Sequence, residues 1–167
     1  VWIAYCGNFF AILPANSVGL ELELDNQEKI RELGLLVKHA ANEQLDIVHP
    51  LHPDVTGIDI VTFYDKPKDA KAAYRNHHIF ANGQVDRSPG GTGTSAMLAY
   101  FLARDDIHTD DTTISEGLAN GHFVGKIVKT WEDKNVCFII PDISSRAFLT
   151  GMHTFYLDSE DPMLLGL

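Results

Sequence analysis

One run of residues limits what this chain can fold into more than any other. Residues 86–96 spell Asp-Arg-Ser-Pro-Gly-Gly-Thr-Gly-Thr-Ser-Ala, between an apolar strand-like segment and an apolar helix-like segment. Pro89 ends the strand, the glycines free the backbone, and Thr94 and Ser95 lead into a helix expected to reach about Ala103. A helix that starts in this way presents unpaired N–H groups and the positive end of its dipole. The run therefore predicts a site for a carboxylate or a phosphate.

Size and charge limit the classes of protein to which the chain can belong. Its 167 residues suffice for one domain with a core, and 45% hydrophobic and 22% charged residues are ordinary for a soluble globular domain. The formal net charge of -10 argues against a nucleic-acid binder or a polybasic membrane binder, because Lys and Arg are too few to neutralise phosphates. No apolar run reaches the roughly 18 residues that a membrane-spanning helix needs, so no membrane partner is expected.

The cysteines and the first residues bear on the origin of the chain. Cys6 and Cys137 lie far apart and outside any C-x-x-C pair, which predicts free thiols in a reducing, cytoplasmic compartment. Residues 1–5, Val-Trp-Ile-Ala-Tyr, resemble the middle of a strand and follow no basic leader. We therefore expect a fragment or a processed chain.

Hydrophobic periodicity predicts a strand-rich chain with two long helices. The expected strands cover residues 1–13 with a break at Gly7-Asn8, 47–48, 58–64, 77–80, 84–87, 123–131, 136–140 and 148–157. The first helix opens at Asp25, with Glu28 at capping-box spacing, and buries a face that reaches Ala41. Asn82-Gly83 predicts a hairpin turn, and Ser144-Ser145 predicts another turn. The pattern is typical of the α+β class.

The histidines raise the hypothesis of a metal site. His49 and His52 are three residues apart, and His77 and His78 are adjacent. However, the sequence contains no helical H-x-x-x-H pair and no Cys/His cluster at finger spacing. Adjacent side chains on a strand also point to opposite faces of the sheet. We therefore expect no metal.

Three further interpretations compete for the glycine-rich run. A P-loop would need a lysine after the glycines, and a dinucleotide fingerprint, even with Ala96 in place of the third glycine, would need an acidic ribose partner. Ser88 and Ser95 stand outside a G-x-S-x-G context, which argues against a serine hydrolase. A plain turn without a ligand stays open, but three glycines and two hydroxyls before an apolar helix favour an anion site.

Four blocks along the chain match one known family. Residues 3–12 resemble the family's strand ending in Tyr-Gly-Gly-Asn-Phe, with Cys6 in place of a glycine. His49-Pro50 and residues 58–63 resemble a mid-domain block, residues 86–96 the active-site turn, and residues 151–155, 157–158 and 161–162 a C-terminal block. On these blocks the chain resembles, from end to end, the second half of a proline racemase or hydroxyproline epimerase.

The resemblance implies a fold and a domain organisation. The family resembles diaminopimelate epimerase, in which each of two similar domains is a curved mixed β-sheet wrapped around a central helix. Residues 1–157 would form the second domain, with the helix after the glycine-rich run at its centre. Residues 158–167 would begin the return towards a first domain that this sequence lacks.

The resemblance also implies a chemistry, because the family racemises amino acids without a cofactor. Two cysteines, one on each face of the substrate Cα, exchange the roles of base and acid. By position, Gly91 and Thr92 would donate backbone N–H groups to the substrate carboxylate, Asp86 would hold the ring ammonium, and Phe80 would wall the pocket around the ring. Gly90 stands where the family has its second catalytic cysteine, and glycine can act neither as acid nor as base.

Several functions follow from the resemblance. The first is a domain of a cofactor-independent racemase or epimerase acting at Cα of proline, inactive in this chain because of Gly90 and the missing first domain. The alternatives are a protein that binds proline or hydroxyproline without turnover, a trans-3-hydroxy-L-proline dehydratase and a 4-hydroxyproline 2-epimerase. An apolar Ile60 favours proline, because hydroxyproline epimerases tend to carry a histidine near that position. The expected partners are a small proline-like substrate, the first domain and a second copy in a homodimer.

Overall fold

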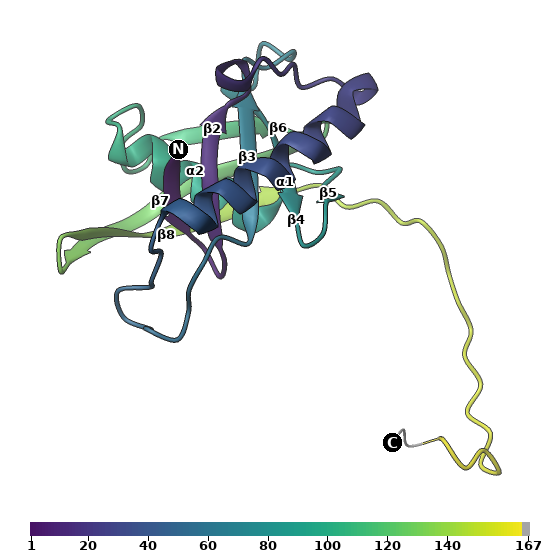
Figure 1. The fold of residues 1–167 in the computed structure, drawn as a ribbon. Helices are drawn as coiled ribbons and strands as arrows, with labels where there is room; N and C mark the ends of the chain where they lie inside the picture. The colour runs from purple at the N-terminus through teal and green to yellow at the C-terminus, as the bar shows by residue number, and fades with distance from the viewer. Residues whose placement is uncertain (165–167) are drawn as a thin grey trace.

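The computed structural model describes residues 1–164, which form one curved mixed sheet with two α-helices (Figure 1). The sheet has eight strands in the order β1-β2-β3-β4-β6-β7-β8, and β5 pairs with β4 beside this path. The strands are β1 (Trp2–Tyr5), β2 (Phe9–Pro14), β3 (Ile60–Asp65), β4 (Tyr74–Phe80), β5 (Gln84–Val85), β6 (Thr112–Glu116), β7 (His122–Asp133) and β8 (Val136–Ser145). The helices are α1 (Gln27–Gln44) and α2 (Gly91–Ala103), with short 3-10 turns η1 (Ala15–Val18) and η2 (Leu24–Asn26).

The two helices cover opposite faces of the sheet, and β2 shows why. Its residues are apolar throughout, and alternate side chains of a strand point to opposite faces. Ala11 and Leu13 join the core under α1, whereas Phe10 and Ile12 join the core around α2. The sheet curves around α2, which contacts β1, β2, β7 and β8. The predicted fold class is confirmed: an α+β domain whose curved mixed sheet surrounds one helix.

The turn signals at Gly7 and Gly83 correspond to turns in the structure. The break at Gly7 becomes a β1–β2 hairpin, with Gly7 at φ +77°, a conformation that glycine adopts readily. Gly83 at φ +101° closes the predicted hairpin between β4 and β5, in which Ile79 pairs with Val85. The helix predicted after the glycine-rich run is α2, and it begins at Gly91 within that run.

Four predictions about local structure were wrong. The strand expected at residues 47–48 is only an isolated bridge between Val48 and Thr56. The capping box at Asp25 and Glu28 does not form, because Asp25 lies in η2 and α1 begins only at Gln27, without a side-chain cap. The turn at Ser144-Ser145 is absent, because β8 runs on to Ser145 and pairs there with β7. Residues 148–157 form no strand, since within the described chain they pair with no neighbouring strand. Strand β6 was not predicted.

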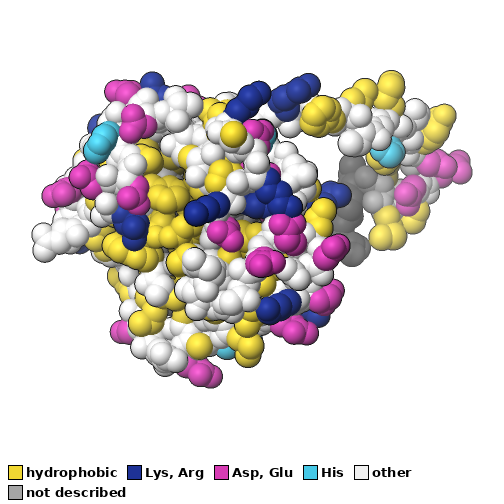
Figure 2. Space-filling view, turned by 90° about the horizontal axis from the view of Figure 1, so that it is seen from above, with side chains coloured by type: hydrophobic (Ala, Val, Ile, Leu, Met, Phe, Trp, Pro, Cys, Tyr) yellow, Lys and Arg dark blue, Asp and Glu magenta, His cyan; other side chains and the backbone are white. Residues whose placement is uncertain are grey.

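The last residues leave the domain as an extended tail (Figure 1). Figure 2 shows the tail to the right of the domain with its hydrophobic side chains uncovered. The predicted return segment 158–167 lies at its end, and residues 165–167 fall outside the described residues. None of the helices in residues 1–164 is long and apolar enough to cross a membrane.

Candidate active site

The glycine-rich run forms a tight turn at the start of α2. Gly90 is the N-cap residue, with φ +71° and ψ 130°, and it has no side chain that could cap the helix. The N–H of Thr94 donates to the carbonyl of Gly90 at 2.8 Å and closes the first helical turn. The N–H groups of the residues before Thr94 have no acceptor within the helix. Gly91 and Thr92 are exposed residues at the positive end of the helix dipole.

Asp86 lies beside this helix start. Its N–H donates to the carbonyl of His78 at 3.1 Å, which extends the β4–β5 pairing to the first residue of the glycine-rich run. Its Oδ1 accepts hydrogen bonds from the N–H and the hydroxyl of Ser88, both at 3.2 Å. Its Oδ2 would be 3.1 Å from a Cβ atom at residue 90. The carboxylate is therefore fixed next to the uncapped N-terminus of α2.

Phe80 is the last residue of β4, two residues after His78, whose carbonyl accepts the hydrogen bond from Asp86. It pairs with Gln84 and is 36% exposed. Strand alternation places its side chain on the same face of the sheet as that of His78, the face that carries α2. The structure thus gathers the predicted residues, Phe80, Asp86, Gly90, Gly91 and Thr92, at one end of α2, and their roles toward a substrate stay predictions.

His78, which sequence reasoning weighed only as a metal ligand, lies directly behind the turn. Its Nε2 is 2.7 Å from the carbonyl oxygen of Pro89, and its Nδ1 is 2.8 Å from the hydroxyl of Thr62. The ring is buried, which lowers its pKa and keeps it neutral. A Cβ atom at Gly93 would lie only 2.0 Å from Nε2, so glycine leaves the space that the ring fills. The adjacent pair His77-His78 indicates only that the two side chains point to opposite faces of the sheet, so no signal in the sequence showed that His78 faces this turn.

His77 points to the opposite face, as predicted for adjacent residues on a strand. Its side chain is buried, and neither ring nitrogen has a hydrogen-bond partner within residues 1–164. Burial lowers the pKa of His77 to about 3. Within the described residues, no three His, Cys, Asp or Glu side chains gather in a way that could hold a metal ion.

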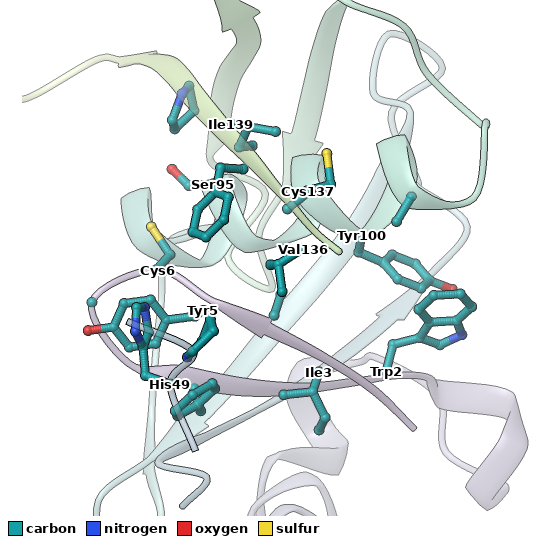
Figure 3. Close-up of a pocket in the computed structure, with 18 of the residues that line it drawn as sticks. Trp2, Ile3, Tyr5, Cys6, His49, Ser95, Tyr100, Val136, Cys137 and Ile139 are labelled. Carbon is teal, nitrogen blue, oxygen red and sulfur yellow. The ribbon is translucent and has the colours of Figure 1, made fainter. Parts of the chain in front are cut away.

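A cavity of about 610 Å³ lies along α2, between the β1–β2 hairpin and the start of β8 (Figure 3). Cys6, Ser95 and Cys137 are among its lining residues. The cavity reaches the glycine-rich turn only through Ser95, whose hydroxyl donates to the carbonyl of Gly91 at 2.9 Å. The atoms nearest to a Cβ at residue 90 belong to His78 and Asp86. Burial also raises the pKa of the Cys6 thiol, which disfavours a reactive thiolate.

The comparison with known proteins covers the same turn and the rest of the chain. The sequence model of the family described as Proline racemase matches residues 1–167. The chain belongs to the proline racemase family. The predicted resemblance is therefore confirmed, and the relatives that carry it include isomerases that act on amino acids.

Three relatives show the range of the family. Proline racemase of Clostridioides difficile is 37% identical over 164 residues, which are 98% of this chain and 49% of the relative. Trans-3-hydroxy-L-proline dehydratase of Bacillus cereus is 35% identical over 98% of this chain and 49% of its own length. A solved hydroxyproline epimerase of Agrobacterium vitis, with bound trans-4-hydroxy-L-proline, has a TM-score of 0.81 and 34% identity over 98% of this chain and 47% of that one. The chain therefore spans about half the length of the relatives it matches.

Proposed function

We propose that this chain is the second domain of a proline racemase-type protein and binds a proline-like amino acid at the N-terminus of α2. The observation that carries this proposal is the uncapped helix start at Gly91 and Thr92 with Asp86 beside it. An amino acid carries one carboxylate and one ammonium group. The helix N–H groups would donate hydrogen bonds to the carboxylate, and Asp86 would attract the ammonium.

The same geometry explains what the turn could do during racemisation. Removing the Cα proton of an amino acid moves negative charge onto the carboxylate. Donors that are already in place where this charge develops stabilise the transition state without reorganisation. The N–H groups of Gly91 and Thr92 belong to the rigid first turn of a largely buried helix, so they meet this requirement.

Residue 90 argues for binding without turnover in this chain. The family's two-thiol mechanism needs an acid or base on each face of the substrate, and Gly90 offers no side chain. Cys6 is not a ready substitute, because its pKa is raised and the atoms closest to residue 90 come from other side chains. We infer that the α-proton of L-proline does not exchange with solvent on the wild-type chain.

The second domain would need a partner over its exposed apolar tail. Phe148, Met152 and Phe155 are 72%, 89% and 87% exposed, although residues 151–155 resemble part of the family's C-terminal block. Large apolar side chains in such number are stable in water only when another surface covers them. We propose that the first domain, which the chain's half-length match implies, provides this surface and receives the return segment that begins at residue 158.

We propose that the choice between proline and hydroxyproline depends on the side chain at residue 60. Ile60 starts β3 and packs against the core around α2. An apolar side chain there offers no hydrogen bond to a ring hydroxyl, which favours proline. The substitution Ile60→His in an active relative should shift the preference towards 4-hydroxyproline, and an unchanged ratio of kcat/KM values would remove this preference from the proposal.

An NMR titration tests the binding proposal. L-Proline added to the ¹⁵N-labelled chain should shift the amide signals of Gly91 and Thr92 before others. The variant Asp86→Asn should weaken this binding about tenfold, since a charge-assisted contact is worth roughly 1.5 kcal/mol. Asp54→Asn is the matched control, because Asp54 is exposed and far from the turn in sequence. Equal weakening by both variants, or shifts confined to other residues, would count against the site.

Hydrogen exchange separates binding from catalysis. L-Proline incubated in D₂O with the chain should keep its α-proton. Gly90→Cys, placed behind the first half of the Clostridioides difficile relative, should gain exchange. Exchange on the wild-type chain would overturn the inference of inactivity, and formation of a pyrroline product from 3-hydroxyproline would favour the dehydratase alternative.

A further inference from the structure

We propose that His78 is the positioning residue that sets the orientation of the glycine-rich turn, and that Thr62 fixes His78 for this task. The inference rests on the proposed carboxylate site, whose donors it would hold in place. Both residues lie on central strands, Thr62 on β3 and His78 on β4, where they pair directly across the sheet. Neither touches the bulk solvent, since Thr62 is fully buried and His78 is 3% exposed.

Two neighbours of Nε2 bear on the tautomer of the imidazole. The carbonyl oxygen of Pro89, 2.7 Å from Nε2, can only accept a hydrogen bond, whereas the amide Nδ2 of Asn76, at the same distance, can only donate one. We assign the proton to Nε2, because both Nε2 and Asn76 Nδ2 then have an acceptor in the Pro89 carbonyl. Nδ1 of the neutral ring is then an acceptor, and the hydroxyl of Thr62 at 2.8 Å is its donor. The ring has no freedom left, because both nitrogens are engaged within the buried sheet.

The Pro89 carbonyl receives a second hydrogen bond from the same strand. Asn76 Nδ2 donates to it at 3.0 Å and also lies 2.7 Å from Nε2 of His78. Two donors from β4 thus hold the carbonyl on the inner side of the turn. In a trans peptide the N–H points away from the C=O, so the N–H of Gly90 faces outward. There it donates to the hydroxyl of Ser88 at 3.3 Å.

The N–H of Gly90 is the first of three successive backbone N–H groups at the start of α2, followed by those of Gly91 and Thr92. Ser88 accepts from it and donates to Asp86, so the same turn orientation also fixes the carboxylate. The helical residues that follow, Gly91 and Thr92, inherit their orientation from this peptide. A hydrogen-bonded chain therefore runs from Thr62 through His78 to both halves of the proposed site.

The packing is as specific as the hydrogen bonds. A Cβ atom at Gly93 would meet the ring of His78 at 2.0 Å, and one at Gly90 would meet it at 3.0 Å. The ring therefore rests against the backbone of the first turn of α2 with no space to spare. A shift of the ring must move the turn.

The first test reads the tautomer directly. Imidazole ¹⁵N spectra of the chain should show His78 with a protonated Nε2 and a bare Nδ1 at pH 7 to 8. Because His77 carries no hydrogen bond within residues 1–164, its signals provide an internal comparison. A protonated Nδ1, or an imidazolium in this range, would overturn the proposal.

The second test removes the hydrogen bond between Thr62 and His78 and leaves the residues of the proposed carboxylate site unchanged. Thr62→Val keeps the side-chain shape but removes the donor to Nδ1, and Thr62→Ser restores that donor. Thr113→Val is the matched control, since Thr113 is also buried in a strand, 5% exposed, and away from this network. The probes are acetate and L-proline, followed through the amide signals of Gly90 and Gly91.

The expected result is a weakening of acetate and L-proline binding by about threefold to tenfold in Thr62→Val, the range that follows from one lost hydrogen bond. Thr62→Ser should bind within about twofold of the wild-type chain. Thr113→Val should change the unfolding midpoint but not the binding. Equal binding by folded Thr62→Val and wild type, with unmoved Gly90 and Gly91 signals, would overturn the positioning role.

The same data separate this inference from the proposed function. If the wild-type chain binds neither acetate nor L-proline, the carboxylate site is wrong. The amide signals of Gly90 and Gly91 then still decide whether His78 sets the turn: they should move in Thr62→Val and return in Thr62→Ser.

Discussion

The contact between Gly93 and His78 leads to a prediction about stability that runs against ordinary helix propensity. In a solvent-exposed helix, replacing glycine by alanine stabilises by roughly 1 kcal/mol. At Gly93 the new Cβ atom would lie 2.0 Å from Nε2 and 2.3 Å from Cε1 of His78. Both distances are far inside the contact distance of about 3.5 Å between such atoms. Gly93→Ala must therefore displace the ring or the helix.

The structure allows the cost to be worked out. The ring cannot retreat without losing its bonds to Thr62 and Pro89, and each buried bond lost costs about 1 to 1.5 kcal/mol. Overpacking of a tight interior adds about 1 to 3 kcal/mol. After subtraction of the gain of roughly 1 kcal/mol in helix propensity, Gly93→Ala should destabilise the chain by about 3 kcal/mol.

Urea unfolding followed by circular dichroism measures this difference. The matched control is Gly91→Ala in the same helical turn, where the new Cβ would meet only Phe123 Cε2, at 3.9 Å. This control should leave the free energy of unfolding within about 0.5 kcal/mol of wild type. The reasoning is refuted if Gly93→Ala is as stable as Gly91→Ala, because His78 would then not be packed against the turn.

Three further predictions concern buried groups and backbone strain. Burial lowers the pKa of His77 to about 3. Between about pH 6.5 and pH 3 the histidine is therefore protonated in the unfolded chain but not in the folded chain, so the free energy of unfolding decreases as the pH falls through this range. Unfolding at pH 7 and pH 5 should differ by about 2 kcal/mol more in wild type than in His77→Leu, and parallel pH profiles would contradict this. Glu116→Gln leaves a buried arginine without its counter-charge and should cost about 3 to 5 kcal/mol in a urea melt, whereas Glu28→Gln at an exposed pair should cost under about 0.5 kcal/mol. Gly90→Ala, at φ +71° with contacts at 3.0 Å, should destabilise by about 1 kcal/mol more than Gly19→Ala, which has φ +63° and open space; equal losses would show that the turn is not tightly packed.

The elements that the sequence predicted correctly are those specified by nearby residues. The break at Gly7, the hairpin at Gly83 and the presence of a helix after the glycine-rich run depend on the local backbone freedom of glycine. The burial of β2 on both faces was not predicted, although it follows from an uninterrupted apolar run. Such features need no knowledge of distant partners.

The elements that were missed depend on partners far along the chain. Strand β6 is short and polar, and its Glu116 is buried only because Arg75 bonds it at 2.6 Å and the N–H groups of Lys68 and Asp69 complete its hydrogen bonds. Residues 148–157 have strand-like residues but no neighbouring strand within the described chain. No local pattern shows either fact.

The candidate site also has one part that nearby residues specify and one part that depends on residues far along the chain. The run from Asp86 to Thr92 could be found from its spacing and from the family resemblance, because one continuous segment provides it. The support behind it could not, since Thr62, Asn76 and His78 come from two strands and meet Pro89 only in the folded sheet. Gly93 looked like one more flexible residue, although the structure shows that it makes room for an imidazole.

The central claim is that backbone N–H groups at the start of α2 bind a carboxylate. The most direct measurement compares Gly91→Pro with Gly91→Ala in calorimetric titrations with L-proline and acetate. Proline is tolerated in the first turn of a helix, and the ψ of 130° at Gly90 suits a following proline, so the two variants differ mainly in one N–H. The account predicts that Gly91→Ala binds like wild type and that Gly91→Pro binds about tenfold more weakly, as one charge-assisted bond is lost. Equal affinity of the two folded variants would contradict it.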